Sequence, residues 1–152
     1  MINESGQFGK RRLKKKKGED RMLLDLLANR VERESFMALA YWVATTDGSL
    51  GLPEIKMLEN FSQETGIADW RQHHERESVS DYCNVFVDDL SRKIVYSNLM
   101  AIGFVDEYEN CAQSRAVETV RKAFEISPEA AHNCKQWLEI VKRSAKAQLY
   151  FD

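Results

Sequence analysis

Two acidic residues, Asp47 and Glu54, flank a predicted helix-to-helix turn in the stretch 40-AYWVATTDGSLGLPEIKMLENF-61. Carboxylate oxygens are the ligands that Ca²⁺ and Mg²⁺ prefer, so the pair suggests a cation site. The same residues also suit turn chemistry, because Asp47 precedes Gly48 and Glu54 follows Pro53 in a first helical turn. The loop is not an EF-hand, since hydrophobic residues stand where that loop needs oxygen ligands.

A second acidic turn emerges when the chain is compared with itself at an offset of 59 residues. Asp47 then falls on Asp106, which follows another apolar helical run. The other aligned pairs share acidic or apolar character: Glu59 with Glu118, Ile67 with Ile126, Val43 with Ile102, Leu58 with Val117, and Phe61 with Val120. Each half therefore predicts a helical hairpin. Because one hairpin cannot bury its apolar stripe alone, the two halves are expected to share one core.

A helix ending in 44-ATTDG-48, a loop and then 53-PEIKML-58, with a related unit later in the chain, resembles the TerB-like family of tellurite-resistance proteins. The resemblance covers residues 34–150. It implies an all-helical bundle of two pseudo-symmetric halves, whose turn acids hold divalent cations. It also implies a protein that joins a membrane-linked stress or metal-response complex, with no established enzymatic reaction.

The candidate metal ligands are therefore Asp47, Glu54 and Asp106, and the candidate ions are Ca²⁺ and Mg²⁺. The second half departs from the first at two positions, because Glu107 stands in place of the turn glycine and Gln113 in place of Glu54. Three carboxylates make a weak site unless carbonyl oxygens assist. Helix-end stabilisation without a metal is thus an open alternative.

The sequence predicts an all-α bundle of about seven helices over residues 19–152, after a disordered basic tail over residues 1–18. The tail has too few apolar residues to offset the entropy of ordering. Helical spacing of apolar residues gives the expected ranges 21–30, 34–47, 53–66, 81–90, 91–106, 113–126 and 127–149, with a short helix or exposed excursion over 69–78. A strand also fits part of 81–90, but helix is favoured because nothing else could pair with a lone strand.

Charge is unevenly distributed along the chain. Residues 1–20 carry seven basic and three acidic side chains, whereas the remainder carries 15 basic and 21 acidic ones. The basic run Lys10–Lys17 is compatible with attraction to an anionic membrane surface, and the alternative is a solvated tail that contacts the acidic body weakly. Nucleic acid is disfavoured because no aromatic residues are interleaved for base stacking. The longest apolar run, 38-ALAYWVA-44, is too short to span a bilayer, and three cysteines at no motif spacing predict free thiols in a cytoplasmic protein.

Few other residues have a spacing that indicates chemistry. His73 and His74 point in different directions on a helix and have no cysteine pair nearby, so exposed polar residues are favoured over zinc ligands. Cys134 lies on an apolar stripe and is predicted to be inert, and Tyr150 and Phe151 are predicted to pack onto the body. The leading prediction is a non-catalytic module that binds a protein partner and a divalent cation. The alternatives are a structural interaction domain without a metal and, third, a metal-assisted hydrolase.

Overall fold

The computed structural model describes residues 22–72, 78–104 and 111–143, and within these ranges the chain is all-helical, with no strand. The predicted fold class is confirmed. The helices of the described ranges are the 3₁₀ helices η2 (Leu24–Leu26) and η3 (Trp70–Gln72) and the α-helices α2 (Arg30–Ala44), α3 (Leu52–Thr65), α4 (Val79–Asn84), α5 (Asp89–Phe104), α6 (Cys111–Ala123) and α7 (Pro128–Arg143).

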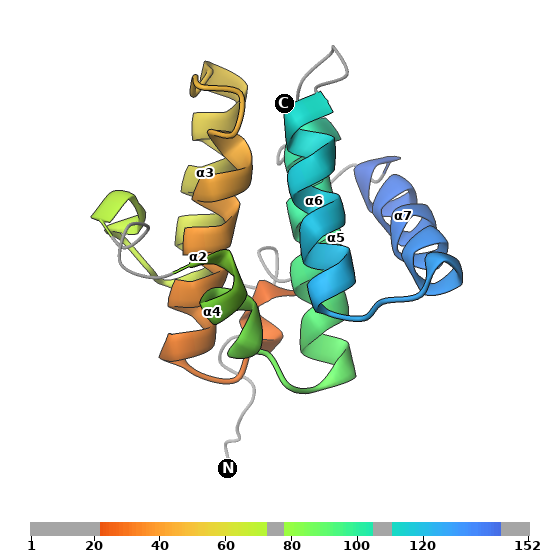
Figure 1. The fold of residues 1–152 in the computed structure, drawn as a ribbon. Helices are drawn as coiled ribbons and strands as arrows, with labels where there is room; N and C mark the ends of the chain where they lie inside the picture. Colours follow the sequence, from red (N-terminus) through yellow and green to blue (C-terminus); the bar gives the residue numbers. More distant parts are fainter. Residues whose placement is uncertain (1–21, 73–77, 105–110, 144–152) are drawn as a thin grey trace.

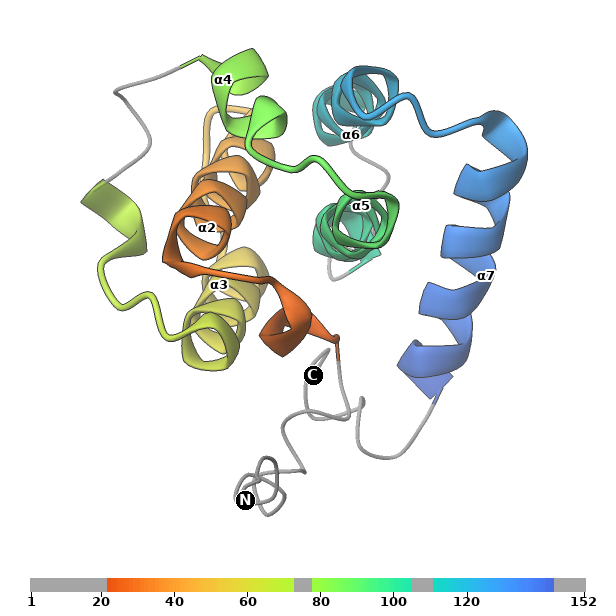
Figure 2. The ribbon, with the colours of Figure 1, turned by 90° about the horizontal axis from the view of Figure 1, so that it is seen from below.

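Two helical hairpins lie side by side and form the centre of the molecule. Helix α2 packs against α3, and α5 packs against α6 (Figure 1). The hairpins meet where α2 contacts both α5 and α6, and α4 closes one end of this contact (Figure 2). Helix α7 lies on the far side of α5, away from α2 and α3. Helix α5 therefore has a packed partner on each of two opposite sides.

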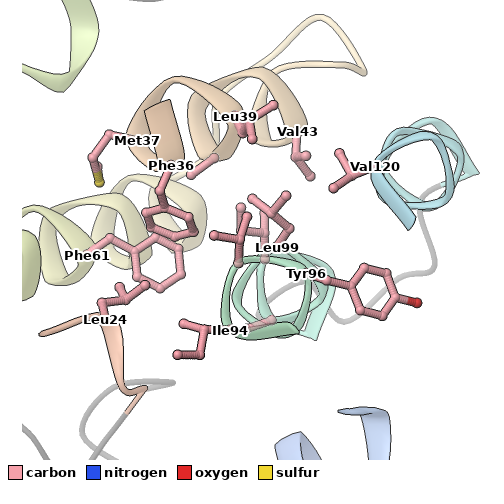
Figure 3. Close-up of a cluster of buried hydrophobic side chains, with 14 of the residues drawn as sticks. Leu24, Phe36, Met37, Leu39, Val43, Phe61, Ile94, Tyr96, Leu99 and Val120 are labelled. Carbon is pink, nitrogen blue, oxygen red and sulfur yellow. The ribbon is translucent and has the colours of Figure 1, made fainter. Parts of the chain in front are cut away.

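One continuous apolar cluster joins the two hairpins (Figure 3). The rings of Phe36 on α2 and Phe61 on α3 pack edge to face with centroids 5.1 Å apart. Val43, Leu99 and Val120, from three helices of both hairpins, are fully buried beside them. Each hairpin alone would expose part of this cluster, and burial of each such side chain stabilises the fold by roughly 1.5–3 kcal/mol.

The segment before α2 departs from the predicted helix over residues 21–30. Of residues 22–29, only Leu24–Leu26 are helical, as a 3₁₀ turn. Asn29 caps α2 by accepting the backbone N–H of Glu32 at 2.9 Å. Met22, Leu24 and Leu27 are all buried. Their spacing does not place them on one face of an α-helix, so tertiary packing overrides the local apolar run. Helix α2 therefore begins at Arg30 rather than at residue 34.

The remaining boundaries follow the local signals of the sequence. Helix α3 ends at Thr65, and the next residue, Gly66, has a φ of 81°, the left-handed conformation that glycine adopts at low cost. Helix α7 begins at Pro128, where the Ser127 hydroxyl accepts the N–H of Ala130 at 3.1 Å. The predicted helix over 81–90 is wrong beyond residue 84, because α4 ends at Asn84 and residues 85–88 form a turn that is neither helix nor strand. The predicted tail over 1–18 and the predicted last turns of α7 lie outside the described residues.

Several contacts recur at the offset of 59 residues found in the sequence. Arg33 donates a side-chain hydrogen bond to the carbonyl of Asp25 at 3.0 Å. Arg33 and Arg92 also each donate side-chain hydrogen bonds to backbone carbonyls at two equivalent positions. The acceptors are those of Leu27 (3.2 Å) and Thr65 (3.4 Å) for the first arginine, and those of Phe86 (2.8 Å) and Phe124 (3.5 Å) for the second. Each arginine thus links the backbone just before the first helix of its hairpin to the backbone at the end of the second helix.

Other equivalent positions behave alike. Glu125, which lies 59 residues after Gly66, also has a positive φ, of 57°. The Ser62 hydroxyl and the Arg121 guanidinium each donate to the carbonyl five residues ahead, both at 2.6 Å. These recurrences concern individual contacts. The pseudo-symmetric arrangement of whole halves and the count of about seven helices stay predictions.

Candidate functional site

Asp47 lies in an exposed turn immediately after α2. The helix stops at Ala44, where the hydroxyls of Thr45 and Thr46 donate back to the carbonyls of its last turn at 2.8 and 2.9 Å. Asp47 Oδ1 then accepts the backbone N–H of Ser49 at 3.1 Å and lies 3.4 Å from its hydroxyl. This is the local hydrogen bonding by which aspartate stabilises a turn, and it places the carboxylate at the surface.

Glu54 lies on the other side of this turn and is buried, with 5% of its surface exposed. Its Oε1 accepts the backbone N–H of Gly51 at 3.1 Å, so the side chain caps the start of its own helix. A Cβ atom on Gly51 would come within 2.8 Å of that oxygen. A larger residue at position 51 would therefore displace the end of the Glu54 side chain by a small distance.

Gln113 on α6 completes the surroundings of Glu54. Its side-chain Nε2 lies 3.4 Å from Glu54 Oε2 and 3.5 Å from the carbonyl oxygen of Ala44, and Gln113 is itself buried. The two side chains are equivalent at the offset of 59 and they meet each other between the hairpins. The amide group thus provides a donor for both a carboxylate oxygen and the last carbonyl of α2.

The contact between Glu54 and Gln113 was missed by sequence reasoning, which took Gln113 only as a lost acid. The repeat held a signal for it, because equivalent residues of two halves related by a two-fold axis meet each other where they lie on that axis. Glu54 therefore lies buried at the contact between the two hairpins, whereas Asp47 lies in an exposed turn.

The predicted three-acid metal site is not assembled within the described residues. Asp106 lies outside them, so its distance from the other two acids is not defined. Among the residues that the structure describes, no group of three or more His, Cys, Asp or Glu side chains is placed to hold a metal ion. Both oxygens of Glu54 already accept hydrogen bonds. Cation binding at Asp47, Glu54 and Asp106 therefore stays a prediction.

The other residues singled out in the sequence fall into two groups. The run Lys10–Lys17 and the pair His73-His74 lie outside the described residues. Cys83 is buried, and burial raises the pKa of its thiol to about 11 despite the opposing charge of Arg92. A thiol with such a pKa is protonated at neutral pH and is a poor nucleophile.

A groove of about 230 Å³ lies between α5 and α7, on the side of α5 opposite to α2. Its walls are mainly apolar and come from three segments: Leu23 beside η2, Leu90 and Ile94 on α5, and Ala130, Cys134 and Trp137 on α7. Ser97, Asn133 and Lys93 add polar groups. Leu90 is 57% exposed, so an apolar surface continues from the groove onto the outside of α5.

Lys93 is the charged group of this groove. Its ammonium pairs with Asp89 at 2.9 Å, and the hydrogen bond to Asp89 raises the pKa of Lys93. Both partners are substantially exposed, and such surface ion pairs contribute little free energy. Lys93 is therefore able to exchange this partner for a carboxylate of a bound molecule. Apolar walls with a few polar groups are typical of recognition sites.

Over the described ranges, the fold is all-helical and has an apolar recess beside α7. Comparison with known proteins found no matching protein-family model, no matching curated protein and no matching solved structure. The resemblance to the TerB-like family thus stays an expectation drawn from the residues of this chain. In the described ranges, no helix is both long enough and apolar enough to cross a lipid bilayer.

Proposed function

We propose that this chain is a non-catalytic helical module that binds a protein partner in the groove between α5 and α7. The observation that carries the proposal is the groove itself, whose apolar walls continue onto the exposed side chain of Leu90. A partner segment with two or three apolar side chains and one acidic residue fits this chemistry. Its apolar groups would cover Leu90 and Trp137, and its carboxylate would pair with Lys93.

The proposal keeps the role that the TerB-like resemblance implies, namely a cytoplasmic protein in a stress or metal response. A divalent cation at Asp47, Glu54 and Asp106 belongs to this proposal. A specific observation favours the alternative of an interaction domain without a metal. Glu54 caps its own helix through Gly51 and accepts a hydrogen bond from Gln113, so this acid already has a structural role.

Site-specific photo-crosslinking tests the groove as the docking site. A photoreactive amino acid at position 90 is expected to capture a partner in cells, whereas the same group at position 52 is not. Leu52 is a matched control, because it is an exposed leucine at the start of α3, in the other hairpin. The captured protein would then be purified and titrated against the wild type and two variants.

Leu90→Asp is expected to weaken that binding at least tenfold, while Leu52→Asp leaves it unchanged. Both leucines are exposed at helix starts, where aspartate is tolerated, so neither substitution is expected to unfold the protein. Equal affinities of the two variants would reject the groove as the docking site.

A further inference from the structure

We infer that the groove between α5 and α7 binds a small amphipathic carboxylate of the medium-chain fatty-acid class. The charged head of this ligand lies at Lys93 and Ser97, and its alkyl chain lies against the apolar walls. The ligand goes beyond the proposed function, because a small molecule can occupy the recess whether or not a protein segment docks there. Three properties of the groove indicate it: the polar groups, the apolar walls and the size.

Ser97 is a buried polar residue in the α5 wall of the groove. It is only 3% exposed, and within the described residues its hydroxyl makes no hydrogen bond. A buried hydroxyl that lacks a partner costs free energy, and a bound ligand atom that accepts its hydrogen bond removes this cost. The groove therefore favours a ligand that places an acceptor oxygen at Ser97.

Lys93 supplies a positive charge on the same face of α5. It lies four residues before Ser97, about 6 Å along the helix axis. Its ammonium has three N–H donors, and Asp89 accepts a hydrogen bond from it at 2.9 Å. The Asp89 side chain is 78% exposed, so water and salt screen its repulsion of a bound anion. One carboxylate can therefore accept from the ammonium with one oxygen and from the Ser97 hydroxyl with the other.

The rest of the groove is suited to a hydrocarbon chain. Apolar side chains line it from both helices and from the segment before η2: Leu23, Leu90, Ile94, Ala130, Cys134 and Trp137. Among the described lining residues, only Lys93, Ser97 and Asn133 are polar. A sugar or a nucleotide would leave many of its polar groups unpaired against these walls, which is costly. A single polar head on an apolar chain avoids that cost.

The size of the groove sets the length of the chain. Its volume is about 230 Å³. An apolar protein cavity of about 150 Å³ binds benzene, so in proportion about nine carbon atoms fit into this groove. Octanoate, with eight carbon atoms, is therefore the probe that matches both the volume and the polar groups.

Titration of the full chain with octanoate, followed by backbone amide chemical shifts, measures both affinity and location. We expect a dissociation constant of about 1 mM or below. The largest shift changes are expected in residues 90–97 of α5 and 130–137 of α7. Hexanoate is expected to bind about 15-fold more weakly, because each buried methylene group contributes about fourfold. The uncharged 1-octanol is expected to bind at least fivefold more weakly than octanoate.

Two variants test the polar groups, each with a matched control. Lys93→Gln is expected to weaken octanoate binding at least fivefold and to leave 1-octanol binding unchanged, whereas Lys135→Gln, at an exposed position of α7 outside the groove, keeps the wild-type affinity. Ser97→Ala is expected to weaken octanoate binding at least threefold. Its control is Ser91→Ala, which alters another buried serine of α5 that does not line the groove.

Equal affinities for octanoate and 1-octanol would overturn the inference, because no group would then recognise the carboxylate. Equal affinities for octanoate and hexanoate would overturn it too, since the chain would then bind no apolar wall. Shift changes centred on α3, or no saturation by 10 mM octanoate (about ten times the expected constant), would also reject the site. These titrations use the chain alone, so the small-molecule site and the protein docking site can fail independently.

Discussion

Replacing Gln113 by glutamate would place two carboxyl groups in buried contact. Gln113 Nε2 lies 3.4 Å from Glu54 Oε2, and the two side chains are 2% and 5% exposed. At that separation and an effective dielectric constant of about 20, two negative charges repel by about 5 kcal/mol. Uptake of one proton avoids this repulsion. At pH 7 it costs about 3.7 kcal/mol for a carboxyl group with an ordinary pKa near 4.3. We therefore expect Gln113→Glu to lower the free energy of unfolding by about 4 kcal/mol at pH 7.

The size of this loss depends on pH. The folded variant would hold one proton that the unfolded chain releases above about pH 4.3, so its stability falls by about 1.4 kcal/mol per pH unit as the pH rises. We expect a loss of about 1 kcal/mol at pH 5 and a plateau of about 5 kcal/mol near pH 8, where repulsion replaces proton uptake. Urea unfolding followed by tryptophan fluorescence at pH 5, 7 and 8 measures the three values.

Two controls make the experiment specific. Gln136→Glu is the same substitution at an exposed position of α7 and is expected to change stability by less than about 0.5 kcal/mol. The swap Glu54→Gln with Gln113→Glu restores one carboxylate and one amide, so it is expected to be more stable than Gln113→Glu alone. A Gln113→Glu variant as stable as the wild type at pH 8 would refute the buried contact. A swap no better than the single variant would refute the pairing.

Three further predictions concern the turns and the core. Millimolar Ca²⁺ or Mg²⁺ at low ionic strength is expected to raise the melting temperature, and Asp47→Asn to abolish the gain; no saturable response would contradict cation binding. Gly66→Ala is expected to lower the free energy of unfolding, measured with urea, by about 1 kcal/mol, because the backbone φ at position 66 is 81°. Glu125→Gly, at a φ of 57°, is expected to leave the free energy of unfolding unchanged. Equal losses in the two variants would contradict the argument from backbone strain. Val43→Asp is expected to unfold both hairpins together, because it places an unpaired charge in the shared core. Backbone amides of α5 and α6 that stay protected from hydrogen exchange in this variant would argue against a shared core.

The sequence by itself determined the helical class and several helix ends, because both depend on neighbours along the chain. Apolar residues at helical spacing predicted the faces of α2 and α5 that are now buried. Gly66 and the Ser127-Pro128 pair marked helix ends through backbone preferences that need no tertiary contact. The offset of 59 was also visible in the sequence, and one pair that it aligned, Ile67 and Ile126, accepts equivalent hydrogen bonds.

Only the tertiary structure decided what lies opposite each side chain. The apolar run after Met22 was predicted to be a helix, but packing against the hairpins shortened it to the 3₁₀ turn η2. The partner of Glu54 is 59 residues away, and no local pattern carries a contact at that separation. The groove between α5 and α7 likewise depends on how two helices pack, because helical periodicity predicts an apolar face but not the shape that two such faces leave between them.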